Sequence, residues 1–153
     1  MDYINPPEKV PQNVIHKTFY SQIFNHELGY NIYLPPGYEE SGEKYPVAYH
    51  LHGWMGNESS EIWTMEKVYK NRQVITVFPN NSTVIEDLEN LPVEDMIINE
   101  FIPYIETHYR TMATQENRSI SGFSMGGGMA FCWAVKYPDL FSSVTAYAGT
   151  YHH

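Results

Sequence analysis

Cysteine is almost absent from the sequence, because Cys132 is the only one among 153 residues. A single cysteine excludes an internal disulfide and a metal site built from several thiolates. Its neighbours Phe131 and Trp133 are large and apolar, so we expect Cys132 to be a small buried apolar residue and not a nucleophile. With no disulfide available, the fold must rest on a hydrophobic core, for which 42% hydrophobic residues are sufficient.

Basic residues are also scarce, with nine Lys and Arg against 18 Asp and Glu and a net charge of −9. Nucleic acid and anionic membrane surfaces both require basic patches, so we expect neither as a partner. An anionic polymer would be repelled too, which favours a neutral substrate. No apolar run is long enough to span a bilayer. The start, MDYINPPEKVPQNV, lacks the basic and apolar regions of a signal peptide, so the chain as written is expected to stay cytoplasmic.

Aromatic residues, by contrast, are abundant, at 15% of the chain with 13 tyrosines. We expect most of them to pack in the core and on the surface. A platform for sugars or phenolic rings is the functional alternative. We expect residues 1–14 to form an irregular N-terminal arm and residues 15–153 to form one domain.

Short apolar runs bounded by turn signals predict buried strands of a mainly parallel sheet. These runs are YPVAYHLHG (45–53), QVITVFPNN (73–81), NRSISGFS (117–124) and FSSVTAYAGTY (141–151), after a hairpin of VIHKTFYSQIF (14–24) and GYNIYLPPGY (29–38). Between Leu91 and Tyr109 the apolar spacing becomes helical, and Pro103 predicts a kink or break there. A second helix is predicted over MGGGMAFCWAVKY (125–137). Strands alternating with helices predict an α/β fold.

The pattern G-x-S-x-G occurs at Gly122-Phe123-Ser124-Met125-Gly126, between a predicted strand and a predicted helix. In that context it is typical of a nucleophilic serine held on a sharp turn, clear of the backbone. Bulky side chains at Gly122 or Gly126 would collide with the flanking elements. Ser124 is therefore the candidate nucleophile, and a glycine-rich turn with an incidental serine is the structural alternative.

A second motif, His52-Gly53, follows a predicted strand and leads into a glycine-containing loop. Hydrolases of this architecture place one oxyanion-hole donor at this position. We assign the two backbone N–H donors to Trp54 and Met125, because preorganised donors stabilise the oxyanion of a tetrahedral intermediate. We expect His52 to fix the loop by hydrogen bonds and not to act as the base.

Other candidate residues are interpreted as structural. His50 is expected to be a packed strand histidine. A metal site from His50 and His52 lacks nearby carboxylate or cysteine partners in the sequence, so no metal is predicted. Asp87 and Asp95 are expected to be loop and helix-start acids.

Four segments occur in the order found in one superfamily: LHGWMGNESSEIW, VITVFPN, INEFIPYIETHYRT and ENRSISGFSMGGGMAFCWAVKYPDLF. The chain resembles the esterase D, feruloyl esterase and antigen 85 superfamily from about Tyr30 onward, and within it carbohydrate esterase family 1. The resemblance implies an α/β-hydrolase fold and ester hydrolysis through an acyl-enzyme on Ser124. It also implies acetyl or feruloyl esters of plant polysaccharide as substrates, and no cofactor. The G-x-S-x-G turn, or serine elbow, taken alone is also compatible with a lipase, a thioesterase or a serine peptidase.

The sequence departs from this family after Ser124, where members place a catalytic acid and then a histidine. Only Asp139, His152 and His153 are available there. Asp139 lies at the far end of the predicted helix, roughly 20 Å from Ser124 at 1.5 Å per residue. Three hypotheses follow: the chain is the first two-thirds of an esterase and lacks the last strands, it completes its site with a second copy or a different chain, or it binds ligand without catalysis. In a homodimer, His152, His153 or His108 would have to act as the base.

Overall fold

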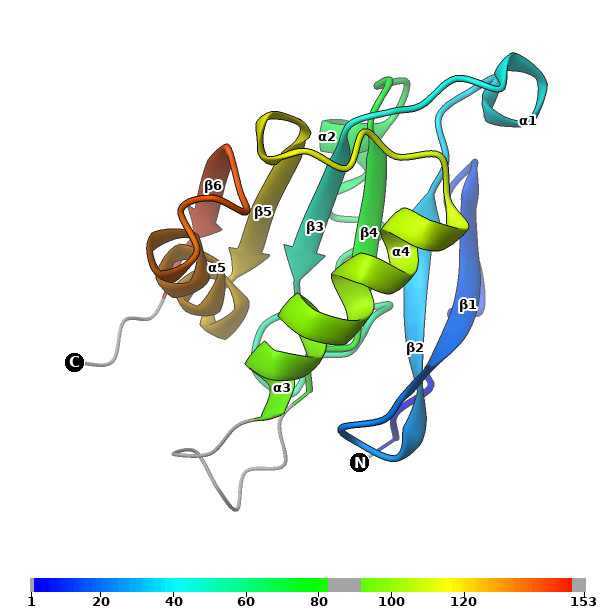
Figure 1. The fold of residues 1–153 in the computed structure, drawn as a ribbon. Helices are drawn as coiled ribbons and strands as arrows, with labels where there is room; N and C mark the ends of the chain where they lie inside the picture. The colour runs from blue at the N-terminus through cyan, green and yellow to red at the C-terminus, as the bar shows by residue number, and fades with distance from the viewer. Residues whose placement is uncertain (1, 83–91, 150–153) are drawn as a thin grey trace.

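The computed structural model describes residues 2–82 and 92–149, and its centre is a six-stranded sheet in the order β1-β2-β4-β3-β5-β6 (Figure 1). The strands are β1 (Val14–Ser21), β2 (His26–Tyr33), β3 (Val47–Leu51), β4 (Ile75–Pro79), β5 (Arg118–Phe123) and β6 (Ser143–Tyr147). β1, β2 and β4 pair antiparallel, whereas β4, β3, β5 and β6 pair parallel. The prediction of a mainly parallel sheet behind an N-terminal hairpin is confirmed, as is the α/β class.

Helical residues 92–108 and 125–136 form two long stretches on one face of the sheet, and the other described helices are short. The helices are α1 (Tyr38–Ser41), α2 (Glu66–Tyr69), α3 (Pro92–Asp95), the π-helix η1 (Met96–Phe101), α4 (Ile102–His108), the 3-10 helix η2 (Gln115–Asn117) and α5 (Met125–Lys136). In Figure 1, α4 and α5 lie in front of the sheet and α2 lies behind it.

The helix expected between residues 91 and 109 does not break at Pro103. α3, η1 and α4 follow one another without interruption, and the turn just before Pro103 widens so that Ile102 N–H bonds to Ile97 O. Proline has no N–H to donate and needs room for its ring. A π-type turn at this point provides that room and lets the helix continue.

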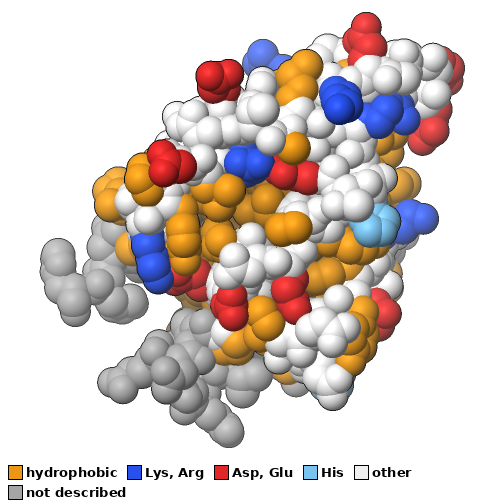
Figure 2. All heavy atoms as spheres, viewed as in Figure 1, with side chains coloured by type: hydrophobic (Ala, Val, Ile, Leu, Met, Phe, Trp, Pro, Cys, Tyr) orange, Lys and Arg blue, Asp and Glu red, His pale blue; other side chains and the backbone are white. Residues whose placement is uncertain are grey.

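The helix-facing side of the sheet carries the larger core. Alternate residues of each strand point to this side, which is the period-2 pattern of a strand. The strands contribute Tyr30, Ile32, Val47, Tyr49, Leu51, Ile75, Val77 and Ile120, and the helices contribute Ile97, Phe101, Ile105, Ala130 and Trp133. Hydrophobic side chains also reach the surface between α4 and α5 (Figure 2).

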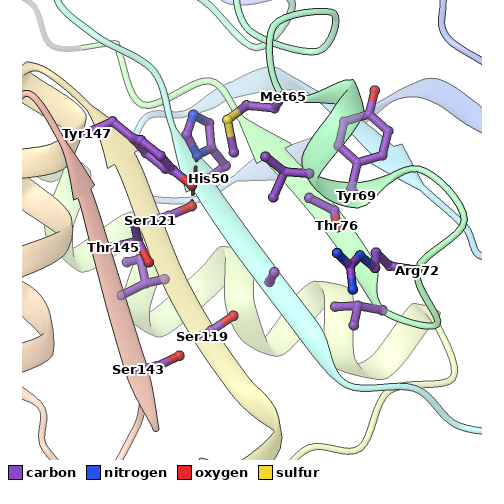
Figure 3. A pocket seen from close by; sticks show the side chains of 14 residues that line it. His50, Met65, Tyr69, Arg72, Thr76, Ser119, Ser121, Ser143, Thr145 and Tyr147 are labelled. Atoms are coloured by element: carbon purple, nitrogen blue, oxygen red, sulfur yellow. Dashed lines mark hydrogen bonds between the residues drawn. The ribbon is translucent and has the colours of Figure 1, made fainter.

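The opposite side of the sheet has two parts of different character. Over β2 and β4, Tyr33, Phe78, Ile62 and Tyr69 form a second core cluster with Val14. Over β3, β5 and β6 the side chains are small or polar and border a hollow of about 340 Å³ (Figure 3). The strand side chains on this face that line the hollow are Ala48, His50, Ser119, Ser121, Ser143, Thr145 and Tyr147, with Thr76 from the adjoining β4.

Cys132 is exposed, so the prediction that it is buried is wrong. α5 turns Trp133 and Ala130 toward the core, and Phe131 and Val135 lie on its outer side at 44% and 66% exposure. Two apolar neighbours in sequence point in different directions on a helix, so they do not bury the residue between them.

The N-terminal residues run across the loop that follows β3. Gly29 N–H donates to Tyr3 O, Trp63 Nε1 donates to Lys9 O at 3.2 Å, and Asn5 Nδ2 donates to Glu58 Oε2 at 3.1 Å. The Glu58 carboxylate is fully buried there and also lies 3.0 Å from His16 Nε2. Within the described part of the chain, no helix is both long enough and apolar enough to cross a lipid bilayer.

Candidate active site

Ser124 lies at the junction of β5 and α5, where the backbone reverses sharply. Its φ of 51° and ψ of −116° are unusual for a residue with a side chain, and such a conformation costs about 1–3 kcal/mol. Ser124 N–H donates to Tyr147 O at 2.8 Å and Ser124 O accepts Gly128 N–H at 3.0 Å, so the end of β6 and the first turn of α5 hold the turn. The serine stands at the first turn of a 12-residue helix, whose free N–H groups favour negative charge.

The glycines around Ser124 are required by close backbone approach. A Cβ at Gly122 would lie 2.2 Å from Gly126 O, and a Cβ at Gly126 would lie 2.3 Å from Leu51 O. No side chain fits at either distance, so α5 packs directly against the ends of β3 and β5. This is the collision that the sequence pattern predicts.

Strand register brings the second motif to Ser124. In the parallel pair of β3 and β5, Leu51 lies opposite Gly122, so both strands end at the same edge of the sheet. The residues that follow are therefore neighbours: a Cβ built on Gly53 would lie 3.5 Å from Ser124 Cβ and 3.3 Å from Phe123 O. The His52-Gly53 motif and the serine elbow thus form one site.

The chain turns back on itself directly after Gly53. Gly56 N–H donates to Gly53 O at 3.0 Å, and Met55 has a φ of 61°, so Trp54 and Met55 occupy the centre of a tight turn. Within the described part of the chain, neither Trp54 N–H nor Met125 N–H donates a hydrogen bond. Two unpaired backbone donors therefore lie near Ser124: Met125 N–H, directly after the serine, and Trp54 N–H, in the turn that follows Gly53.

Both ring nitrogens of His52 are occupied by backbone partners. Nδ1 lies 2.8 Å from Gly53 O and must donate to it, whereas Nε2 accepts Asn81 N–H at 3.1 Å. These contacts require a neutral ring, and burial lowers the pKa of His52 below its usual value. An imidazole tied in this way holds the loop and has no free nitrogen to take a proton from Ser124.

Asn81 is a site residue that the sequence analysis missed. Its side chain accepts His52 N–H at 2.8 Å and donates to His52 O at 3.1 Å, so it continues the hydrogen-bond ladder of β3 beyond the last strand residue. Two asparagines directly after the apolar run of β4 could have indicated this role, because β4 and β3 end at the same edge. Their partner could be named only once the strand order was known.

His50 is buried on the strand, as expected, but it has two polar partners that the sequence did not predict. Its Nδ1 lies 2.8 Å from Ser121 Oγ, which Figure 3 marks with a dashed line, and its Nε2 lies 2.5 Å from Glu61 Oε2. The other oxygen of Glu61 accepts Gly53 N–H at 3.3 Å. The expectation that no carboxylate lies near His50 was wrong, because the loop after Gly53 folds back over β3.

The remaining candidate acids and bases do not reach Ser124. Asp139 is exposed in the turn after α5, about 18 Å along that helix from the serine. His108 ends α4 at the other edge of the sheet, since nearby Thr111 bridges to Tyr45 ahead of β3. Asp95 is exposed on α3 and accepts a hydrogen bond from Asn99.

Asp87, His152 and His153 lie outside the described residues. Among the described residues, no side chain hydrogen-bonds to Ser124 Oγ, and no group of three or more His, Cys, Asp and Glu could hold a metal ion.

Comparison with known proteins assigns the family. Residues 21–152 match the family model Esterase, described as "Putative esterase". The chain belongs to the Esterase family. Among curated proteins of similar sequence, Esterase Rv1288 of Mycobacterium tuberculosis is 31% identical over 133 residues, covering 79% of this chain and 29% of that protein. An endo-1,4-beta-xylanase/feruloyl esterase of Xylanibacter ruminicola is 28% identical, covering 84% of this chain and 20% of that enzyme.

Solved structures of esterases share the fold. One ferulic acid esterase superposes with a TM-score of 0.77 at 30% identity, covering 89% of this chain and 60% of its own. The CE1 ferulic acid esterase of Anaeromyces mucronatus, bound to ferulic acid, has a TM-score of 0.77 at 26% identity, covering 97% of this chain and 62% of its own. The resemblance to carbohydrate esterase family 1 is confirmed, and this chain spans less than two-thirds of these relatives.

Proposed function

We propose that this chain carries the nucleophile and oxyanion donors of a serine carboxylic-ester hydrolase. The observation that carries the proposal is the geometry at Ser124: a strained turn at φ 51° with an unbonded Oγ, near Trp54 and Met125, whose N–H groups have no partner in the described part of the chain. A strained backbone at a serine lowers the stability of the fold, and such residues are concentrated at active sites. Membership of the Esterase family supports the same chemistry.

In this mechanism Ser124 Oγ attacks the ester carbonyl carbon while a base removes its proton. The carbonyl oxygen becomes an oxyanion, which accepts hydrogen bonds from Trp54 N–H and Met125 N–H. Collapse of the intermediate breaks the ester C–O bond, and the base returns the proton to the leaving alcohol. Water then repeats the sequence on the acyl-enzyme and frees the acid. Each oxyanion donor contributes about 3–4 kcal/mol to such a step.

The substrate class that we propose is acetyl or feruloyl esters of plant polysaccharide. Two ferulic acid esterases and a xylanase/feruloyl esterase are among the relatives. The net charge of −9 favours an uncharged acyl group on a neutral sugar. Trp54 and Met55, at 63% and 83% exposure, and Phe123, at 47%, offer apolar surface around Ser124 for an acyl chain or a phenolic ring.

We propose that the acid and the base reach Ser124 from polypeptide outside the described residues, whether further along the same protein, in a second copy of it or in a different chain. β6 is an edge strand of the described sheet, and apolar side chains near it are exposed: Phe123, Phe131, Val135 and Tyr147. Exposed apolar surface beside an open strand favours association. A polypeptide that covered this edge would bring its side chains beside Ser124.

Hydrolysis of 4-nitrophenyl acetate by the wild-type chain and by Ser124→Ala at equal concentration tests the function. A rate that disappears in the variant supports the proposal. Equal rates would contradict catalysis by this chain alone and favour ligand binding without turnover. Substitution of His108, His152 and His153 one at a time then tests the homodimer, which is excluded if every variant keeps the wild-type rate.

A further inference from the structure

We propose that Glu61 is a positioning residue for the oxyanion turn, anchored to the sheet through His50 and Ser121. This inference rests on the proposed function of Ser124, because it concerns how the turn that bears Trp54 is held. Glu61 lies in the loop between β3 and α2, eight residues after Gly53.

The two oxygens of the Glu61 carboxylate connect two different parts of the site. Oε1 accepts Gly53 N–H at 3.3 Å, and Oε2 accepts the hydrogen on His50 Nε2 at 2.5 Å. Gly53 is the residue before Trp54, so the first contact acts on the peptide unit next to the proposed donor. A hydrogen bond to a charged acceptor is stronger than a neutral one, which suits a tether on an irregular loop.

The second contact fixes the carboxylate to the rigid part of the fold. The His50 side chain is 2% exposed and its ring lies 5.6 Å from the Phe78 ring and 6.1 Å from the Tyr147 ring. Its Nδ1 is held by Ser121 Oγ at 2.8 Å, and His50 pairs with Ser121 across β3 and β5. The tether therefore ends on the same two strands that carry the oxyanion turn and the serine elbow, which keeps donor and nucleophile in fixed relation.

Ser121, His50 and Glu61 are hydrogen-bonded in the order of a hydrolytic triad, but a second active serine does not follow from that order. Ser121 stands within β5, whose backbone N–H groups are used in the parallel ladders with β3 and β6. An oxyanion formed there would have no preorganised backbone donors. The arrangement suits a support and not a second nucleophile.

The test compares the wild-type chain with Glu61→Ala, Glu61→Gln and the control Glu66→Ala. Glu66 is an acid of the same segment that pairs with Lys70 at the surface, so its loss should leave the turn in place. For 4-nitrophenyl acetate we expect Glu61→Ala to lower kcat about 10- to 100-fold with KM changed less than about 3-fold, because a small displacement of a catalytic group costs rate and not binding. Glu61→Gln should recover most of kcat, since its amide oxygen can still accept Gly53 N–H.

A second readout needs no activity. In ¹H–¹⁵N spectra the Gly53 amide proton should move upfield in Glu61→Ala and stay in place in Glu66→Ala. A Gly53 signal unchanged in Glu61→Ala, or a kcat within about 2-fold of wild type, would overturn the proposal. If the wild-type chain hydrolyses no faster than Ser124→Ala, the proposed function fails, and the Gly53 signal still decides whether Glu61 holds the turn.

Discussion

Replacement of Gly126 by alanine is the sharpest test of how α5 sits against the sheet. The new Cβ would lie 2.3 Å from Leu51 O and 2.6 Å from His52 O, about 0.7 Å inside the 3.0 Å limit that real Cβ atoms respect. Both obstacles are backbone atoms at the end of β3, so the helix must move away from the strand. Overpacking of this kind costs about 3 kcal/mol.

The same substitution also has a favourable term. Alanine is a better helix former than glycine by about 1 kcal/mol, so the net loss in the free energy of unfolding should be about 2 kcal/mol. With a urea m-value of about 2 kcal/mol/M, the midpoint of unfolding should fall by about 1 M.

Gly127→Ala is the matched control, because it adds the same methyl group one residue later in the same helix. Its Cβ would meet Gly122 O at 3.0 Å and Tyr147 O at 3.3 Å, which small shifts can relieve. Its free energy of unfolding should stay within about 1 kcal/mol of wild type. Equal urea midpoints for Gly126→Ala and Gly127→Ala would refute the claim that α5 touches the backbone of β3.

Three further predictions concern buried polar groups. Asn81→Ala should lower the free energy of unfolding by about 3 kcal/mol, because His52 N–H and C=O lose their partners in a buried position; a urea midpoint within 0.5 M (about 1 kcal/mol) of wild type would contradict this. The free energy of unfolding should fall as the pH drops below about 6.5, because His52 binds a proton in the unfolded state and stays neutral when buried in the folded state. Urea titrations at several pH values should show a weaker pH dependence for His52→Gln than for the wild type. Glu106→Gln should cost about 3 kcal/mol in thermal or urea unfolding, because Arg118, paired with it at 2.6 Å and 3.0 Å, would remain buried without a counter-charge; a loss below about 0.5 kcal/mol would count against it.

Local sequence patterns predicted the parts of the site that lie within one turn of chain. The G-x-S-x-G pattern between a strand and a helix located the elbow, and the Gly122 and Gly126 contacts follow from the same spacing. His52 hydrogen-bonds to Gly53 O and Asn81 N–H through its two ring nitrogens, and its expected role in holding the oxyanion loop stays a prediction. These features depend on backbone conformation over a few residues, which residue type largely determines.

The partners of these residues could not be predicted, because they come from segments distant in sequence. Asn81 reaches His52 across 29 residues, and Ser121 reaches His50 across 71. Which strands are neighbours decides both contacts, and the sequence alone gave strand positions but no order. The prediction that Cys132 is buried failed for a related reason, because apolar neighbours along the chain do not indicate which side of a helix faces the sheet.

The N-terminal segment has a consequence for where this domain begins. The family match starts at residue 21, in the middle of the first hairpin. Yet Tyr3 satisfies the backbone of Gly29, and Asn5 and His16 surround the buried Glu58 carboxylate. A shortened gene product starting at the matched boundary would leave that buried carboxylate without the hydrogen-bond partners that Asn5 and His16 provide. The first residues thus belong to the folding unit itself. An expression tag should be added before them and should not replace them.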